Sequence, residues 1–257
     1  MSIATTDLDR TRTLLTDTGF EFAQEALPEL IEQGVREELS LPGFLELVLR
    51  RERDSREERR VRTSLKLSGL PRGRTIEDFD FTFQRGGDRR GIEMLSTCEY
   101  ARMRENVLLL GPPGVGKTHL AAGLGVKAVQ NGFSVTYLTA DELISRMRRD
   151  SQNERRRMSR RKYMRAAVLI IDELGFQTMD RRDAHLLFQV ISYRYEKTST
   201  IITSNKSIRE WPDMLAGDEV LATALLDRLL HHCHVMNIDG RSYRLRHMNQ
   251  AIETNQE

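Results

Sequence analysis

Hydrophobic residues in the first part of the chain return at the spacing of a helix. Over residues 14–31, apolar side chains recur every three or four positions, as on one face of an α-helix. Gly34 is expected to end this helical segment, because glycine weakens a helix interior. A second helix is predicted from Leu41–Pro42, with Ser40 as its N-cap, since a serine hydroxyl can accept a hydrogen bond from a first-turn amide. Residues 1–70 are therefore predicted to form an all-helical domain.

The segment from Pro71 to Asp88 has the composition of a linker but carries aromatic side chains. Gly69 is expected to end the preceding helix, and further glycines follow within the segment. Phe79, Phe81 and Phe83 alternate along it, which indicates that the segment lies against the next domain. We therefore expect a helical domain over residues 1–70, a packed linker over 71–88 and a core domain over 89–257.

Beyond residue 88 the pattern changes to short, continuously apolar runs separated by helical stretches. One helix is expected over Arg89–Arg102. Five strand candidates follow, at Val107–Leu110, Ser134–Leu138, Ala167–Ile171, Thr200–Thr203 and His234–Ile238. Helices are predicted between them, at His119–Gln130, Asp141–Arg149, Asp183–Glu196 and Leu221–His231. Short buried strands that alternate with helices are typical of a parallel sheet covered on both faces, so the predicted fold class is α/β.

Composition excludes several classes of protein. The 257 residues carry a net charge of +2, which by itself predicts no polyanionic partner. The two cysteines, Cys98 and Cys233, are far apart and form neither a disulfide framework nor a paired zinc motif. The first residues lack the apolar core of a secretory signal, and no apolar run approaches the ~18 residues of a membrane span. A cytoplasmic protein with no membrane partner is therefore expected.

The run Gly111–Thr118 reads GPPGVGKT and lies between a predicted strand and a predicted helix. In this context the pattern G-x-x-x-x-G-K-[ST] predicts a phosphate-binding loop. Its glycines let main-chain N–H groups approach a phosphate, Lys117 can reach the β- and γ-phosphates, and the Thr118 hydroxyl can bind Mg²⁺. The expected nucleotide-binding residues are Gly111, Pro112, Pro113, Gly114, Val115, Gly116, Lys117, Thr118 and His119.

Polar side chains at the ends of two later strands indicate that the phosphate-binding site hydrolyses ATP. Asp172 directly follows an apolar strand and is expected to hold Mg²⁺ together with Thr118. Glu173 comes next and can polarise an attacking water. Asn205 follows the next strand and is expected to orient that water beside the γ-phosphate. The sequence therefore predicts an ATPase that uses Mg²⁺, with Lys117, Glu173 and Asn205 among its catalytic residues.

Residues 146–165 are densely basic, with only Asp150 and Glu154 interrupting the run. Two interpretations stay open for them: contacts with the phosphates of double-stranded DNA that do not depend on base sequence, or a solvated helix face. Arg50–Arg62 is also basic but is mixed with acidic residues, which favours a helix laced with ion pairs or a subunit contact. The candidate DNA-contacting residues are Arg155, Arg156, Arg157, Arg160, Arg161 and Lys162.

Three histidines surround Cys233 near the end of the last predicted helix, at positions 231, 232 and 234. Consecutive residues on a helix point in different directions, so these side chains are not expected to converge on one metal ion. A structural role near a subunit interface is the favoured interpretation.

The chain resembles the IstB-type ATPases in five motifs taken in order: GPPGVGKTHLA, VLIIDELG, TIITSN, ALLDRLLHHCHV and GRSYRLR. These ATPases are transposition helper proteins encoded beside a transposase in bacterial insertion sequences. They are related to the helicase loader DnaC and the initiator DnaA within the AAA+ group. The resemblance extends from about Leu14 to Arg246. Phe176 departs from the family pattern, in which tyrosine is expected after DELG; it keeps the ring and loses the hydroxyl.

The resemblance implies more than the residues do alone. It implies a P-loop NTPase core of AAA+ type, with five parallel strands in the order 5-1-4-3-2 behind the helical domain. It also implies that ATP binds between subunits, with Arg228 as an arginine finger for a neighbour's site and Arg244 as a contact to ATP in its own subunit. The implied partners are double-stranded DNA, further copies of this chain and a cognate transposase.

Alternative functions stay open at this point. A helicase loader or replication accessory factor would use the same ATPase core with a helicase as its partner. A nucleotide-gated DNA scaffold would bind ATP with little turnover. A P-loop metabolite kinase is disfavoured by Asp172–Glu173, Asn205 and Arg228.

Overall fold

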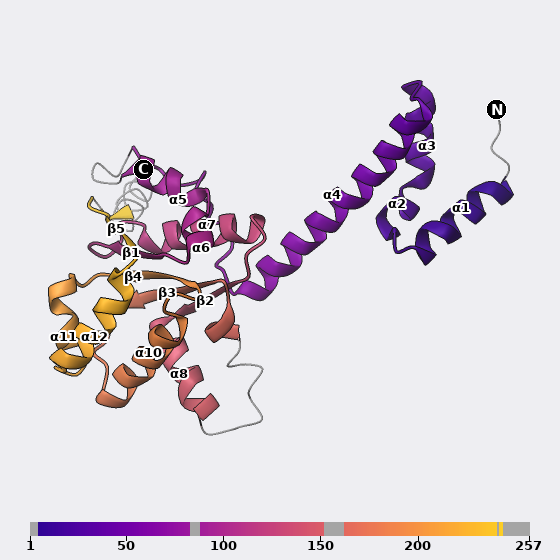
Figure 1. Cartoon of the computed structure of the whole chain (residues 1–257). Coiled ribbons are helices and arrows are strands. Elements are labelled where there is room, and N and C mark those ends of the chain that lie inside the picture. Colours follow the sequence, from indigo (N-terminus) through magenta and orange to yellow (C-terminus); the bar gives the residue numbers. More distant parts are fainter. Residues whose placement is uncertain (1–4, 83–87, 152–161, 241, 244–257) are drawn as a thin grey trace, which may run out of the picture. The chain divides into compact units, whose positions relative to one another are not determined.

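The computed structural model describes residues 5–82, 88–151, 162–240 and 242–243 (Figure 1). The chain divides into two compact units, Met1–Thr63 and Ser64–Glu257. The division falls inside the long helix α4 (Leu41–Ser68). Among the described residues, no helix combines the length and the apolar character that crossing a membrane requires.

The first unit is a small helical assembly. It contains α1 (Thr5–Asp17), α2 (Glu21–Glu25), α3 (Leu27–Arg36) and most of α4. Its buried apolar cluster consists of Ala23, Ala26, Leu30 and Val48. Glu52 is also buried there, and it accepts hydrogen bonds from the Ala23 amide at 2.8 Å and from Arg56 at 2.5 Å.

The prediction that Gly34 ends a helix is wrong. Gly34 lies inside α3 and is buried, and a Cβ atom built on it would lie 2.8 Å from the ring of Phe44. Glycine is therefore used there for close packing, while the chain turns at Gly19, where φ is +80°. The Ser40 N-cap is confirmed, because the Gly43 amide donates to the Ser40 hydroxyl at 3.3 Å. Gly69 ends α4 in the left-handed conformation, as predicted.

The second unit is built on a five-stranded parallel sheet in the order β2-β3-β4-β1-β5, which confirms the predicted order. The strands are β1 (Asn106–Leu110), β2 (Val135–Thr139), β3 (Val168–Leu174), β4 (Ser199–Ser204) and β5 (Cys233–Asn237). The described helices are α5 (Arg89–Ser96), α6 (Glu99–Met103), α7 (Lys117–Gln130), α8 (Ala140–Ser151), α10 (Arg181–Arg194), the short 3-10 helix η2 (Ile208–Glu210), α11 (Trp211–Met214) and α12 (Glu219–Leu230).

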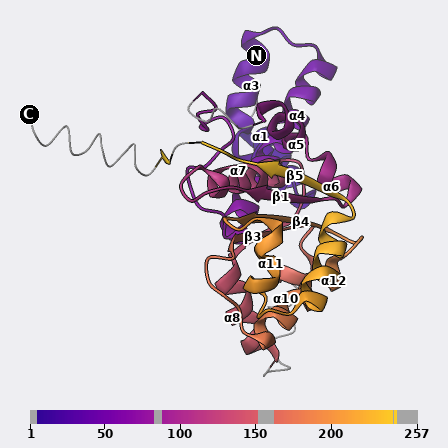
Figure 2. The same cartoon turned by 90° about the vertical axis from the view of Figure 1, so that its left-hand side faces the viewer.

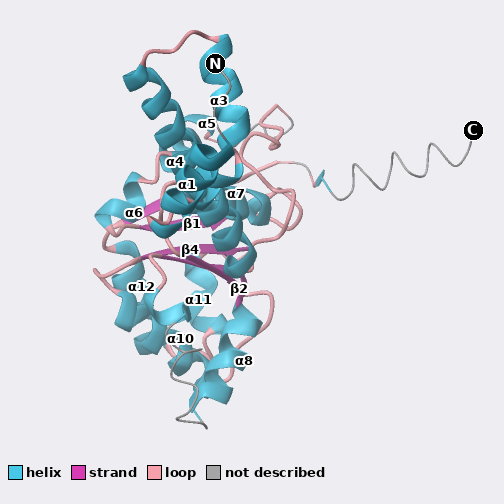
Figure 3. Cartoon of the chain, turned by 90° about the vertical axis from the view of Figure 1, so that its right-hand side faces the viewer, coloured by secondary structure: helices cyan, strands magenta, loops and turns pink. Residues whose placement is uncertain are grey.

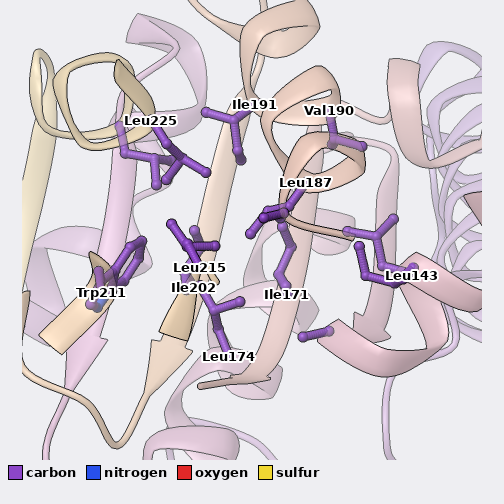
Figure 4. Packing of buried hydrophobic residues seen from close by; sticks show 14 of the residues in the cluster. Leu143, Ile171, Leu174, Leu187, Val190, Ile191, Ile202, Trp211, Leu215 and Leu225 are labelled. Carbon is purple, nitrogen blue, oxygen red and sulfur yellow. The ribbon is translucent and has the colours of Figure 1, made fainter. Parts of the chain in front are cut away.

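Helices cover both faces of this sheet. Helices α5, α6 and α7 lie on one face, while α8, α10, α11 and α12 lie on the other (Figures 2 and 3). Adjacent strand residues alternate between the faces: Ile170 contacts the α7 side at Gly125, and Ile171 belongs to the cluster on the α8–α12 side. That second cluster includes Trp211, which is fully buried and fixes the segment after β4 (Figure 4).

Two details of the second unit differ from the prediction. The single helix expected over Arg89–Arg102 is two helices, because buried Cys98 takes the left-handed conformation at φ +62° between them. Strand β3 runs on to Leu174 instead of ending at Ile171, and its register against β4 shifts between those two residues. The shift coincides with Glu173, whose φ is +60°, so the irregularity lies at the predicted catalytic carboxylate.

Candidate nucleotide-binding site

The predicted site residues gather where the sheet's strands end. The loop Gly111–Thr118 connects β1 to α7, while Asp172 and Glu173 lie at the end of β3 and Asn205 directly follows β4. These strands are neighbours in a parallel sheet, so their carboxyl ends meet at one edge, where α/β proteins bind ligands. A cavity of about 610 Å³ opens there. Its lining includes Lys117, Thr118, Glu173, Thr203 and Asn205.

The phosphate loop requires its glycines for two different reasons. Gly114 and Gly116 have φ of +84° and +97°, a region that L side chains rarely adopt. A Cβ on Gly114 would lie 2.2 Å from the Ser242 hydroxyl, and one on Gly116 would lie 2.5 Å from the Phe79 ring. The loop therefore combines a left-handed backbone with close approach by segments from both ends of the second unit.

Lys117 is buried at the start of α7 and directs its ammonium group back into the loop. Its Nζ donates to the carbonyl oxygens of Gly111 at 2.6 Å and Pro112 at 2.7 Å. Because Lys117 lies in the first turn of the helix, its charge adds to the positive end of the helix dipole. An anion bound in the loop would meet both charges.

Asp172 is buried and surrounded by hydroxyl groups from three other elements. Thr118 on α7 donates to its Oδ1 at 3.0 Å, and Thr203 on β4 donates to the same oxygen. Tyr137 on β2 donates to Oδ2. Burial raises the pKa of Tyr137 above its ordinary value, and the hydrogen bond to Asp172 adds to that rise. Tyr137 therefore stays protonated and remains a donor.

Glu173 and Asn205 lie closer to solvent than Asp172. The Glu173 side chain is exposed and lines the cavity, while its backbone amide donates to the Thr203 hydroxyl at 2.9 Å. The Thr203 hydroxyl thus contacts both acidic residues: it donates its hydrogen to Asp172 Oδ1, and its oxygen accepts a hydrogen bond from the Glu173 amide. Asn205 is half-buried on the same cavity wall. This arrangement places an exposed carboxylate and an amide in the same cavity as the phosphate loop.

The linker forms a further wall of the cavity. The lining includes the linker residues Arg72, Arg74, Asp78, Phe79 and Asp80. Tyr243, which follows the last strand, lines the same cavity. Phe79 is buried and meets His119 and Tyr243 edge to face, with ring centroids 5.5 Å and 5.9 Å apart. The His119 ring also hydrogen-bonds the Thr75 carbonyl through Nε2 at 2.7 Å. This wall offers apolar and charged groups beside the phosphate loop.

Sequence reasoning missed several of these residues. It identified the linker phenylalanines as packing residues and did not assign Phe79 to the site. It also missed Thr203 and Tyr137, which contact Asp172 from the strands on either side of β3. The predicted sheet order contained a usable signal, because it places β2 and β4 beside β3, so hydroxyl residues near their carboxyl ends were candidates.

Arg228 is not among the residues that line the cavity of its own chain. It is half-buried on α12, where its Nη1 donates to the Ala224 carbonyl at 2.7 Å and its guanidinium lies 5.0 Å from the centre of the Phe188 ring. The other arginine expected at the nucleotide, Arg244, lies outside the described residues, as do Arg155, Arg156, Arg157, Arg160 and Arg161.

The described members of the basic segments are partly occupied by other contacts. Lys162 is exposed and donates to the Leu67 carbonyl at 3.1 Å. Arg148 pairs with both Asp183 and Asp180, so part of its charge is compensated. Ion pairs also lace α4, among them Arg50 with Glu46 at 2.5 Å, as the mixed charges there indicate.

The prediction that consecutive histidines do not converge is wrong for His231 and His232. The rings of His231 and His232 lie 4.2 Å apart between centroids, and potential ligand atoms of both lie within 4.8 Å of one another and of the Glu196 carboxylate. Residue 231 caps α12 and the chain turns after it, which brings the two rings together. All three side chains are exposed. His234 instead pairs with Glu105 at 2.7 Å.

Comparison with known proteins gives a consistent result. A family model described as IstB-like ATP binding protein matches residues 13–251. The insertion sequence IS21 ATP-binding protein of Pseudomonas aeruginosa is 44% identical over 93% of this chain and 89% of its own length. The insertion sequence IS5376 ATP-binding protein of Geobacillus stearothermophilus is 46% identical over 81% of this chain and 82% of its own length.

Two solved structures share the fold. A structure of DnaI superposes with a TM-score of 0.57 at 20% identity, covering 69% of this chain and 94% of that one. The DnaC helicase loader superposes with a TM-score of 0.50 at 23% identity, covering 58% of this chain and 86% of the loader chain. Together with the sheet order, these similarities show that the second unit shares its α/β fold with the DnaC and DnaI structures.

Proposed function

The chain belongs to the family of IstB-like ATP-binding proteins, and from this premise we propose that it is a cytoplasmic, Mg²⁺-dependent ATPase that assists a transposase. In its ATP-bound form it assembles with further copies of itself on double-stranded DNA. Hydrolysis then releases the DNA. The observation that supports this proposal best is the convergence of Lys117, Thr118, Asp172, Glu173 and Asn205 on one edge of the sheet.

The phosphate loop binds the triphosphate in this proposal. Lys117 exchanges its two carbonyl acceptors for phosphate oxygens, which are stronger acceptors because they are charged. The amides at the start of α7 donate to the same phosphates. The linker wall around Phe79 packs against the nucleoside portion of ATP, because it adjoins the loop and presents an apolar ring.

The oxygen groups beside the loop suit Mg²⁺, which prefers carboxylate and hydroxyl oxygens. Thr118 and Asp172 would hold the ion, since their side chains already meet at 3.0 Å. When bound, Mg²⁺ supplies positive charge that neutralises the phosphate oxygens. Glu173 accepts a proton from the attacking water, and Asn205 orients that water by hydrogen bonding.

Arg228 completes the site of a neighbouring subunit in this proposal. Its side chain extends from α12 and does not line the cavity of its own chain, and the Phe188 ring limits its freedom, which reduces the entropy lost on contact with a partner. A guanidinium that reaches a neighbour's γ-phosphate stabilises charge in the transition state. ATP hydrolysis then depends on assembly.

The proposed DNA contact and transposase partner rest on other evidence. The relatives at 44% and 46% identity are proteins of insertion sequences, which favours transposition over helicase loading. The DnaC and DnaI similarities lie at 20–23% identity and support the fold alone. Lys162 is an exposed cation at the end of the basic segment and can contact the phosphate backbone without reading bases.

A mixing experiment tests the shared site. Lys117→Ala and Arg228→Ala are each expected to abolish hydrolysis, measured as phosphate release with Mg²⁺ and duplex DNA. Mixed in equal amounts, they should recover part of the activity, because the first supplies the arginine and the second supplies the phosphate loop. Arg209→Ala, a change of an exposed arginine, is the control and should behave as the unmodified protein. Absence of recovery in the mixture would place Arg228 outside the neighbour's site.

A further inference from the structure

The most buried acidic residue of the site is held by a hydroxyl that no motif identifies. Asp172 is 2% exposed, and Tyr137 donates to its Oδ2 from the neighbouring strand β2. Thr118 and Thr203 both donate to the other oxygen, Oδ1. Each oxygen of this carboxylate therefore has its own hydroxyl donor.

The position of Tyr137 in the sheet explains how its hydroxyl reaches Asp172. Tyr137 pairs with Ile170 in the parallel register, and Thr139 pairs with Asp172. The backbone of Tyr137 therefore lies opposite a residue two positions before Asp172. The length of the tyrosine side chain carries its hydroxyl across that distance along the sheet. Smaller side chains at position 137 could not reach Oδ2, whereas phenylalanine would fill the same volume without donating.

Donors on both oxygens restrict the carboxylate in a way that one donor cannot. The last torsion of an aspartate side chain is broad and nearly two-fold, so an unrestrained carboxylate turns readily. Burial also penalises its charge unless hydrogen bonds compensate. The Tyr137 hydroxyl opposes both effects, because it donates to Oδ2 from the neighbouring strand β2.

We propose that Tyr137 is a positioning residue for the metal of this site, holding Oδ2 of Asp172 so that Oδ1 stays directed toward Thr118. The inference rests on the proposed function, in which Thr118 and Asp172 hold Mg²⁺. The Thr118 hydroxyl has two tasks, because its oxygen would ligate the ion while its hydrogen donates to Asp172. Tyr137 has no such second task, so it keeps the carboxylate in place in both states.

The test is the variant Tyr137→Phe, which removes one oxygen and preserves the ring. Mn²⁺ binding is measured by electron paramagnetic resonance in the presence of a non-hydrolysable ATP analogue. We expect the affinity for Mn²⁺ to fall about tenfold, the ratio that corresponds to about 1.4 kcal/mol. Binding of the analogue without metal should change less than about twofold. Tyr193→Phe, which alters a partly exposed tyrosine on α10, is the matched control and should leave both affinities unchanged.

Two further variants separate positioning from general destabilisation. In an Asp172→Asn background, adding Tyr137→Phe should cause no further loss of Mn²⁺ affinity, because the carboxylate that the hydroxyl holds is absent. Equal losses in both backgrounds would overturn the proposal, as would unchanged affinity in Tyr137→Phe alone.

A probe at position 137 decides the matter if Tyr137→Phe does not fold. Replacing the tyrosine by 3-fluorotyrosine keeps the hydroxyl, and its fluorine resonance should shift when Mn²⁺ or Mg²⁺ joins the bound analogue. An unmoved resonance would overturn the proposal. Because these measurements need binding alone, they stay decisive even if the protein binds ATP and metal without hydrolysing ATP, an outcome that would refute only the proposed activity.

Discussion

The phosphate loop and the acidic side of the site face one cavity but are assembled in different ways. The loop is a single uninterrupted segment, Gly111–Thr118. The acidic side, here called the carboxylate corner, consists of Tyr137, Asp172, Glu173 and Thr203 and draws on three strands. Its hydrogen bonds exist because β2 and β4 pair with β3 in one particular register. The loop therefore depends mainly on local backbone geometry, and the corner depends on the sheet.

The two regions also divide the proposed chemistry by charge. The loop presents the Lys117 ammonium and backbone amides, which in the proposed function bind phosphate directly. The corner presents two carboxylates and two hydroxyls, which in the proposed function bind a cation and a water. Changes in the loop should therefore weaken nucleotide binding with or without metal. Changes in the corner should leave metal-free nucleotide binding intact and should weaken metal binding or hydrolysis.

Glu173→Gln in the corner should separate hydrolysis from nucleotide binding by the largest factor. Removing the proton acceptor should lower the rate of ATP hydrolysis by about 100- to 10,000-fold, while ATP affinity changes less than about twofold. Phosphate release and fluorescent-nucleotide binding measure the two quantities. Glu93→Gln, an exposed residue on α5, is the control and should change neither. Equal losses of binding and hydrolysis would show that Glu173 supports the structure and not the chemical step.

Lys117→Ala tests the other side of the comparison. We expect ATP affinity to fall about 100-fold or more, because the side chain donates charged hydrogen bonds, each worth about 1.5–3 kcal/mol. The loss should be similar with Mg²⁺ and with a chelator, as measured by titration calorimetry. Lys206→Ala, at a partly buried lysine after β4, serves as the control. A loss confined to Mg²⁺-containing solutions would contradict the separation between loop and corner.

Thr203→Val is expected to have the smallest of these effects and to sharpen the comparison. The change keeps the shape but removes a donor to Asp172 and the acceptor for the Glu173 amide. Hydrolysis should fall about tenfold, and the free energy of unfolding by about 1–3 kcal/mol, because a backbone amide loses its partner. Urea denaturation and phosphate release measure these changes. The exposed Thr223→Val should alter neither, and metal-free nucleotide binding should survive in Thr203→Val.

Much of the fold follows from the pattern of the chain, and the exceptions have physical causes. The pattern located all five strands, and its clearest apolar runs lie in β1, β3 and β4, which are almost wholly buried. The Ser40 cap was readable because a cap is a local hydrogen bond. The roles of Gly34 and Cys98 are not predicted correctly. Gly34 allows the Phe44 ring to pack closely against its helix. Cys98 interrupts a helix although the apolar spacing continues through it.

Within the site, the same distinction decides what could be predicted. Asp172 and Glu173 were identified because an acidic pair at the end of an apolar strand is a local pattern. Tyr137 and Thr203 were not, because a hydroxyl within a strand carries no sign of the group opposite it. Phe79 was expected to pack, but its contact with Gly116 is a meeting of segments far apart in the chain.

The sequence by itself determined the phosphate loop, the acidic pair and the alternation of strands and helices. Each of these features depends on residues that are close together in the sequence, because backbone sterics and hydrophobic periodicity determine local structure. Only the tertiary structure decided which hydroxyls surround Asp172, that the linker forms a wall of the cavity, and that Arg228 does not line that cavity. Those features depend on strand register and on packing between distant segments, and short-range patterns do not encode either.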